Sequence, residues 1–155
     1  MQYSAMISNI SLRAAAPEDA PFFYRVIAET MRDHVVAIWG AWNEERVQSE
    51  CRERVRSANA RIIMAGDDPA GILTVGKHND HIHLDQIMLL EPFQRKGIGG
   101  VLVRQLITEA FDRRVPLRLR VLRGNSALHF YERLGFLITE QTPEHTYMEY
   151  RTHLR

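Results

Sequence analysis

The stretch Gln94–Gly100, with the sequence QRKGIGG, combines residue types that could bind an anionic ligand. Its glycines, Gly97, Gly99 and Gly100, lie between an apolar strand-like segment and an apolar helix-like segment. Glycine lets the backbone approach a ligand closely and adopt a positive φ, and the first N–H groups of a helix have no partner within the helix. Because the helix dipole also favours negative charge at this end, the spacing predicts a cradle for a phosphate group.

Two familiar nucleotide loops do not fit this stretch. A P-loop needs lysine and then Ser or Thr directly after its last glycine, whereas Lys96 precedes the glycines here. A dinucleotide fingerprint needs a third glycine where this chain has Leu102. Taken alone, the stretch is also compatible with an ordinary glycine-rich turn that starts a helix.

A second motif lies downstream, and the two together are far more specific than either alone. Asn125–Phe136, with the sequence NSALHFYERLGF, follows the strand-like segment Pro116–Leu122. This order of a glycine loop, a helix, a strand and an Asn…Phe-Tyr…Gly-Phe helix closely resembles the GNAT superfamily of acyl-CoA-dependent N-acyltransferases. The close resemblance covers residues 81–136.

The resemblance implies acetyl-CoA as cofactor, with CoA as the product. In the family, the pantetheine arm lies along the fourth strand and bonds its backbone, and the pyrophosphate rests on the glycine loop. By position, the expected cofactor-binding residues are Ile87, Met88, Leu89, Gln94, Arg95, Lys96, Gly97, Ile98, Gly99, Gly100 and Asn125. Core packing is an additional role for Ile87 and Leu89, and helix capping is an alternative role for Asn125.

Tyr131 is the expected general acid, since the family often has a tyrosine at this place in the motif. A phenol held near the departing sulfur can donate a proton to the CoA thiolate. The alternative is an aromatic side chain that packs in the core, a role that the neighbouring Phe130 already fills.

A general base must remove a proton from the attacking amine, and the candidates are His83 and Asp85. Alternation along a strand predicts that both share a face with Ile87. Some family members place a glutamate base where this chain has His83. Because histidine replaces glutamate here, His83 could instead be an ordinary surface residue, and a bound water could be the base. The nearby His78 and His81 suggest a metal cluster only weakly, because their spacing does not establish convergent ligands. We therefore predict no metal.

The acceptor amine is expected to contact the first helix and the last strands. These segments vary most within the superfamily, so the acceptor itself is not predicted. Trp39 and Trp42 could equally be packing anchors, since large aromatic side chains dominate protein cores. The expected substrate-binding residues are Met31, His34, Trp39, Trp42 and Tyr147.

Composition and charge exclude several classes of protein. The chain has 155 residues, of which 45% are hydrophobic, which suits one domain spanning residues 1–155. No apolar run is long enough for a membrane span, and no signal peptide is evident, so we expect a cytoplasmic protein. A net charge of +1 argues against partners that are nucleic acids or membranes. The single cysteine, Cys51, excludes an internal disulfide.

The hydrophobic periodicity predicts an α+β fold. The pattern gives a mixed sheet with helices on both faces. The resemblance implies that this central sheet is GNAT-like and mostly antiparallel, with about six to seven strands. The expected strands are Ile7–Ala14, Arg61–Ala65, Gly71–Val75, His81–Leu90, Pro116–Leu122, Phe136–Glu140 and Tyr147–Thr152. The expected helices run to about His34, from Asn43, over Ile98–Phe111 and over Asn125–Leu134.

The sequence thus predicts an N-acetyltransferase that moves an acetyl group from acetyl-CoA to a primary amine of a small molecule or peptide. Because Cys51 is remote from both motifs, we expect direct attack in a ternary complex, without a covalent cysteine intermediate. The alternative is an acyl-CoA sensor that keeps the fold without catalysis. A homodimer is compatible with either function.

Overall fold

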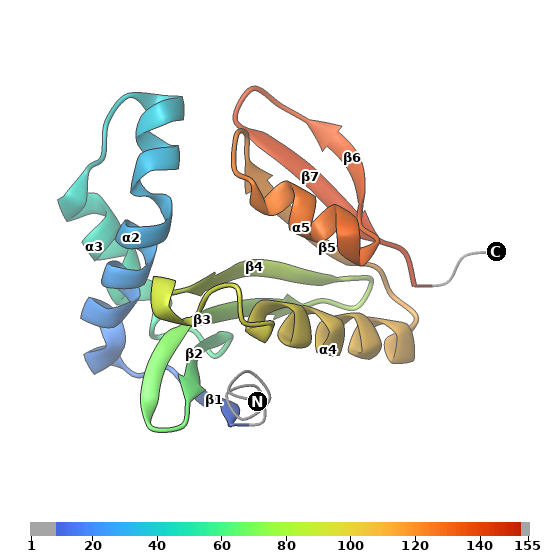
Figure 1. Cartoon of the computed structure of the whole chain (residues 1–155), viewed down its shortest axis with the longest axis horizontal. Helices are drawn as coiled ribbons and strands as arrows, with labels where there is room; N and C mark the ends of the chain where they lie inside the picture. The colour runs from blue at the N-terminus through green and yellow to red at the C-terminus, as the bar shows by residue number, and fades with distance from the viewer. Residues whose placement is uncertain (1–8, 153–155) are drawn as a thin grey trace.

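The computed structural model describes residues 9–152, which form one seven-stranded sheet flanked by helices (Figure 1). The strand order is β1-β2-β3-β4-β5-β7-β6, and every neighbouring pair is antiparallel except β4 with β5. The strands are β1 (Ile10–Ala14), β2 (Ala60–Ala65), β3 (Asp68–Lys77), β4 (Ile82–Leu89), β5 (Leu117–Leu122), β6 (Leu137–Gln141) and β7 (His145–Tyr150). The predicted mixed, mostly antiparallel α+β sheet is confirmed; the expected start of β1 at residue 7 lies outside the described residues.

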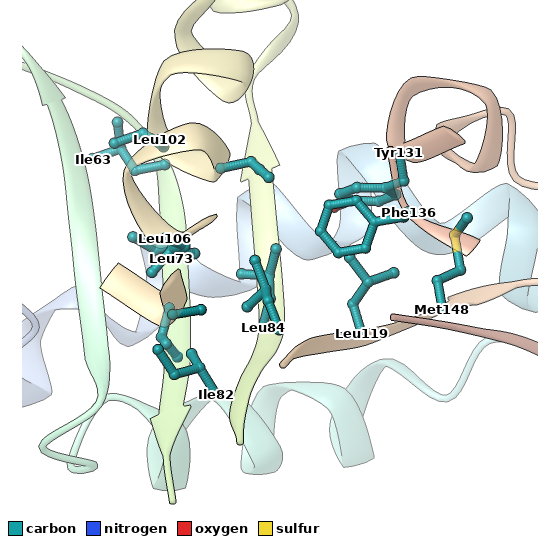
Figure 2. Close-up of a cluster of buried hydrophobic side chains, with 14 of the residues drawn as sticks. Ile63, Leu73, Ile82, Leu84, Leu102, Leu106, Leu119, Tyr131, Phe136 and Met148 are labelled. Atoms are coloured by element: carbon teal, nitrogen blue, oxygen red, sulfur yellow. The ribbon is translucent and has the colours of Figure 1, made fainter. Parts of the chain in front are cut away.

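The helices cover both faces of this sheet, as predicted. They are α2 (Ala20–Trp39), α3 (Glu44–Arg54), α4 (Ile98–Arg113) and α5 (Ala127–Leu134), with short 3-10 turns η1 (Pro17–Asp19) and η2 (Glu91–Phe93). One hydrophobic cluster packs α4 and α5 against one face, and a second packs α2 and α3 against the other. Figure 2 shows the first cluster, in which Leu102 and Leu106 of α4 lie near Leu73, and Tyr131 of α5 lies near Leu119.

Several element boundaries differ from the sequence prediction; β7, for example, begins at His145, two residues before the expected Tyr147. Helix α2 continues past His34, because Ile38 extends its half-buried stripe, and the helix ends only where Gly40 adopts a φ of 81°. Strand β3 is ten residues long, so the hairpin from β2 has a tight turn at Gly66 and Asp67. Helix α5 begins two residues after Asn125.

The second helix begins as its sequence predicts. The Asn43 side chain accepts a hydrogen bond of 3.0 Å from the backbone N–H of Arg46, so it caps α3. Glu44 and Glu45 follow in the first turn, where negative charge is favoured by the helix dipole. Helix α3 packs against α2 through Cys51 and Val55, so the two helices form a unit over β3 and β4.

Candidate active site

The two central strands, β4 and β5, separate soon after they meet. They pair in parallel only over Ile82–Leu84 and Leu117–Leu119, although β4 continues to Leu89 and β5 to Leu122. In Figure 1, β5 and β7 run away from β4 together with α5. The edge of β4 from Asp85 onward therefore has no neighbouring strand on the β5 side. Its backbone N–H and C=O groups can bond an extended ligand there, because edge groups require partners.

A β-bulge in β4 lies at the point where this separation begins. Val75 of β3 pairs with Leu84, and Thr74 pairs with Gln86, so Asp85 is the extra residue. A bulge bends a strand and increases its twist, which turns β4 away from β5. It also changes which side chains share a face.

The prediction that His83 and Asp85 share a face with Ile87 is wrong. Ile87 pairs with Leu73 and packs in the cluster beneath α4, together with Leu84. Because the bulge shifts the alternation by one residue, His83 lies on the opposite face, which α2 and α3 cover. Asp85 lies there too, since its carboxylate bonds the His83 ring.

The glycine loop is held in place at the end of β4. Turn η2 leads into the loop, and the side-chain amide of Gln94 donates a hydrogen bond of 2.7 Å to the carbonyl of Leu89. Arg95 has a φ of 58°, and Gly97 has a φ of 86° and precedes the first helical residue, Ile98. Two left-handed residues in this short loop turn the N-terminus of α4 toward the separating strands.

Space is available at the first turn of α4 for a group close to the backbone. A Cβ atom added at Gly99 would meet only the Phe130 ring, at 3.7 Å, whereas one at Gly100 would lie 3.0 Å from the Arg104 guanidinium. The free N–H groups of this turn begin at Ile98. The predicted phosphate-binding residues, including Lys96, thus lie together at this helix start.

Asn125 lies one position before the N-cap of α5 and bonds the first turn of that helix. Its side-chain oxygen accepts a 2.9 Å hydrogen bond from the backbone N–H of Ala127, while Ser126 occupies the cap position without a side-chain bond. The side-chain amide N–H groups of Asn125 remain available as donors. The expected N-cap position of Asn125 is therefore wrong by one residue, although its side chain bonds the first turn of the helix; a contact with the cofactor stays a prediction.

Tyr131 lies at the centre of the cluster beneath α5. Its side chain is only 6% exposed, and its ring packs edge-to-face against Phe130 and against Phe136, the latter visible in Figure 2. Burial raises the pKa of Tyr131 far above its ordinary value of 10.0, so the phenol keeps its proton at neutral pH. Among the described residues its hydroxyl has no hydrogen-bond partner, yet the oxygen is not fully buried. It can therefore donate to a ligand.

The His83 ring is oriented by Asp85. Its Nδ1 atom lies 2.7 Å from the Asp85 carboxylate, and this bond is the largest cause of the lowered pKa of Asp85. The side chains are 28% and 41% exposed, so a substrate can reach them. With Nδ1 engaged by the carboxylate, the opposite nitrogen Nε2 is left to accept a proton.

The neighbouring histidines stack rather than converge. His78 and His81 lie face to face with ring centroids 4.5 Å apart, and His81 meets the edge of the His83 ring at 6.3 Å. Within residues 9–152, no three His, Cys, Asp or Glu side chains are arranged to hold a metal ion.

The expected acceptor residues divide into two groups. Met31 and His34 are half-buried on α2, and Trp39 at its end faces His145, with ring centroids 6.2 Å apart; His145 in turn lies 6.1 Å from Tyr147 of β7. Trp39, His145 and Tyr147 form one row on the face of the sheet that carries His83. The row was only half visible in the sequence, because His145 has no motif around it.

Trp42 lies elsewhere, as a packing anchor. Its indole N–H donates a 3.1 Å hydrogen bond to the Tyr24 hydroxyl, and the Arg32 guanidinium lies 5.3 Å from its ring centre. Cys51 is buried between α2, α3 and the sheet, where burial raises the pKa of its thiol to about 11. It is therefore not a nucleophile at neutral pH.

The model of the acetyltransferase (GNAT) family matches residues 23–136 of this chain. The chain belongs to the GNAT family. The match spans both motifs and the separating strands β4 and β5, so the resemblance seen in the sequence is confirmed. The family uses acetyl-CoA, as the resemblance implied. No curated protein matches this chain in sequence.

Solved structures of the family share the whole fold. The PaiA N-acetyltransferase from Thermoplasma acidophilum, solved in complex with coenzyme A, is 22% identical, with 92% of this chain and 98% of that chain covered and a TM-score of 0.69. An acetyltransferase from Thermus thermophilus is 21% identical, covers 94% and 98%, and has a TM-score of 0.72. The ribosomal-protein-S18-alanine N-acetyltransferase from Escherichia coli is 20% identical, covers 94% and 96%, and has a TM-score of 0.66.

Across residues 9–152, every helix is too short or too polar to cross a membrane. This GNAT chain thus combines a gap beside β4, a glycine loop at one end of it, and a tyrosine and a histidine–aspartate pair on opposite faces.

Proposed function

We propose that this GNAT protein is an N-acetyltransferase that moves an acetyl group from acetyl-CoA to a primary amine by direct attack in a ternary complex. The observation that carries the proposal is the separation of β4 from β5 after Leu84. It leaves a strand edge for an extended cofactor and lets side chains from both faces reach one point. Tyr131 would approach from one face and the His83–Asp85 pair from the other.

The cofactor-binding residues fit acetyl-CoA in shape and charge. Acetyl-CoA supplies the acetyl group as a reactive thioester. The backbone of Ile87–Leu89 would bond the pantetheine amides, and the N–H groups from Ile98 onward would bond the pyrophosphate, with Arg95 and Lys96 adding positive charge. Gln94 would act by holding the loop on β4, since its amide is bonded to Leu89.

His83 would act as general base toward the amine. The amine attacks only as the neutral species, so its proton must leave first. Nε2 of His83 is the acceptor, and the Asp85 carboxylate fixes the ring and stabilises its protonated form. Asp85 is itself a poor base here, because its lowered pKa means that the carboxylate has a low affinity for a proton.

Tyr131 would act as general acid toward the leaving sulfur. Its high pKa keeps the phenol protonated until the carbon–sulfur bond breaks. Burial disfavours a thiolate as well as a phenolate, so the same surroundings raise the proton affinity of the leaving group. The raised pKa of the phenol therefore does not by itself prevent the proton transfer.

A panel of primary amines, small molecules and peptides, incubated with acetyl-CoA tests this proposal. We expect release of free thiol together with an acetylated amine in the mass spectrum. Acetyl-CoA binding in calorimetry without thiol release from any amine would instead favour an acyl-CoA sensor. We further propose that the protein acts in the cytoplasm and that its acceptor is neither a nucleic acid nor a membrane. A homodimer is compatible with this function, and the mass of the protein in solution would test it.

A further inference from the structure

Arg120 is an exposed cation beside the gap that the mechanism above does not use. It is the first residue of β5 beyond the stretch paired with β4, whose last pair joins Leu84 and Leu119. His83 pairs with Arg118, so Arg120, two residues further along, points to the same face as His83. The step along β5 is about 6.6 Å, from the usual rise of a strand.

Arg120 differs from its neighbour Arg118 in having no partner. Arg118 forms an ion pair of 2.9 Å with Glu149, and Arg151 bonds the other oxygen of the same carboxylate. Within residues 9–152, the Arg120 guanidinium makes neither a hydrogen bond nor an ion pair, and Glu144 is not paired with it. A positive charge is thus presented without a counter-charge from the protein.

Aromatic rings border this charge. Arg120 pairs across the strands with Tyr147, which is followed in the same row by His145 and Trp39. Burial, and after it the charge of Arg120, lowers the pKa of His145 below its ordinary value of 6.5, against the opposing effect of Glu144. His145 is therefore neutral at pH 7, and the charge at this place belongs to Arg120.

We infer that Arg120 binds an anionic group of the acceptor, so that the substrate of the proposed reaction is a small primary amine carrying a carboxylate or a phosphate. This inference rests on the proposed function, because the amine is placed at His83. From there the remainder of the molecule extends over the same face, toward Arg120 and the rings of Tyr147 and Trp39. Guanidinium is well suited to either anion, since its fork bonds two oxygens at once.

Matched pairs of amines test the inference through thiol release. One pair is an amino acid and its amide, and the other is phosphoethanolamine and ethanolamine. Each pair differs in the anion, and kcat/KM is expressed per neutral amine because the anion also changes the pKa of the amine. We expect a higher kcat/KM for the anionic member of at least one pair, and the two pairs distinguish a carboxylate from a phosphate. Arg120→Gln should lower kcat/KM for the anionic member about 10- to 100-fold and change the neutral one by less than about twofold.

Two controls separate this role from others. Arg52→Gln makes the same change at an exposed position on α3 and should leave both amines unaffected. The affinity for acetyl-CoA should be equal in wild type and Arg120→Gln; a weaker affinity, with equal losses for both members of a pair, would assign Arg120 to the cofactor and overturn the inference. Equal kcat/KM values of wild type for both members of both pairs would also overturn it.

Binding can be read without turnover. In saturation-transfer NMR on the CoA-loaded protein, the anionic amine should give a signal with wild type and Arg52→Gln that is lost with Arg120→Gln. If no amine releases thiol, the proposed function fails, while an Arg120-dependent signal still supports the inference. A signal that is equal in all three proteins, or missing from all three, contradicts it.

Discussion

At the scale of single residues, the site combines an acid that is protected by burial with a base that is oriented by a carboxylate. Tyr131 is buried among aromatic rings, and His83 is accessible and bonded to Asp85. Each side chain is suited to one direction of proton transfer, because burial keeps the phenol neutral and the carboxylate favours the protonated imidazole. Substitutions at these positions should therefore act on rate more than on cofactor binding.

Tyr131→Phe removes the hydroxyl and keeps the ring that packs against Phe136. We expect the turnover number to fall about 10²–10⁴-fold, the usual contribution of general acid catalysis, while the dissociation constant of acetyl-CoA stays the same. Stopped-flow thiol release and calorimetry measure the two quantities. An unchanged rate would leave Tyr131 with a packing role only.

His83→Ala and Asp85→Asn test the base through the pH profile of kcat/KM. His83→Ala should slow the reaction and remove the limb along which activity rises with pH. Asp85→Asn should slow the reaction less than His83→Ala, because the imidazole is kept and only the partner that orients it is weakened. If both variants keep the parental profile and rate, the base is another group or a bound water.

At the scale of elements, the start of α4 joins the cofactor to the fold. The helix begins at Ile98 after the left-handed Gly97, and its first turn carries Gly99 in an open position. Gly97 is a poor place for a test, since any side chain there would be strained at its φ of 86°. Gly99 has ordinary space around it, so a substitution there reports on the ligand.

Gly99→Val should weaken acetyl-CoA binding about 10- to 100-fold, because its methyl groups would hold the pyrophosphate away from charge-assisted N–H donors. The nearest atom to the new Cβ belongs to the Phe130 ring at 3.7 Å, so the fold should tolerate the change. Calorimetry gives the affinity, and the thermal unfolding midpoint is the control. Equal affinity in a folded variant would exclude this turn as the phosphate site.

At the scale of the whole molecule, one buried carboxylate ties the first strand to the first long helix. Asp19 accepts two hydrogen bonds of 2.9 Å from Arg13 of β1 and one of 2.8 Å from the backbone of Ala16. The bond to Arg13 is the largest cause of its lowered pKa. This lowered pKa makes the stability of the fold depend on pH.

Asp19→Ala should lower the free energy of unfolding at pH 7 by about 1–3 kcal/mol, since it leaves these donors without their acceptor. A carboxylate with a depressed folded-state pKa stabilises the fold above its unfolded value, 3.8, and this contribution is lost as the pH falls through the lower folded value. The difference between wild type and variant should therefore shrink below pH 3.8 in urea denaturation.

The exposed pair Arg25–Glu29 provides the control for this measurement. Its side chains are 58% and 52% exposed, so Glu29→Ala should cost no more than about 0.5 kcal/mol. Equal losses for Asp19→Ala and Glu29→Ala at pH 7, or a difference from wild type that persists at pH 2, would contradict a special role for Asp19.

The family, the fold class and the loop that starts α4 could be predicted from the sequence. The signals that predicted them are local: the glycine spacing, the NSALHFYERLGF motif and the periodicity of Ile98–Phe111. Such signals depend only on residues close in sequence, so the packing of the rest of the chain does not change them. The same locality explains the confirmed Asn43 cap, which depends only on a bond to Arg46 three residues away.

Which side chains lie close together depends on strand pairing between distant segments. The bulge at Asp85 arises from the pairing of β4 with β3, and it moved His83 to the face opposite Ile87, which alternation alone could not predict. The same is true of Arg120, for which the sequence alone indicates no more than a place among exposed arginines. Arg118 and Arg120 occupy equivalent alternating positions in the sequence. Among the described residues, however, Arg118 forms an ion pair with Glu149, whereas Arg120 forms none. Ion-pair and hydrogen-bond partners from distant segments depend on strand register, and strand register cannot be predicted from a short motif.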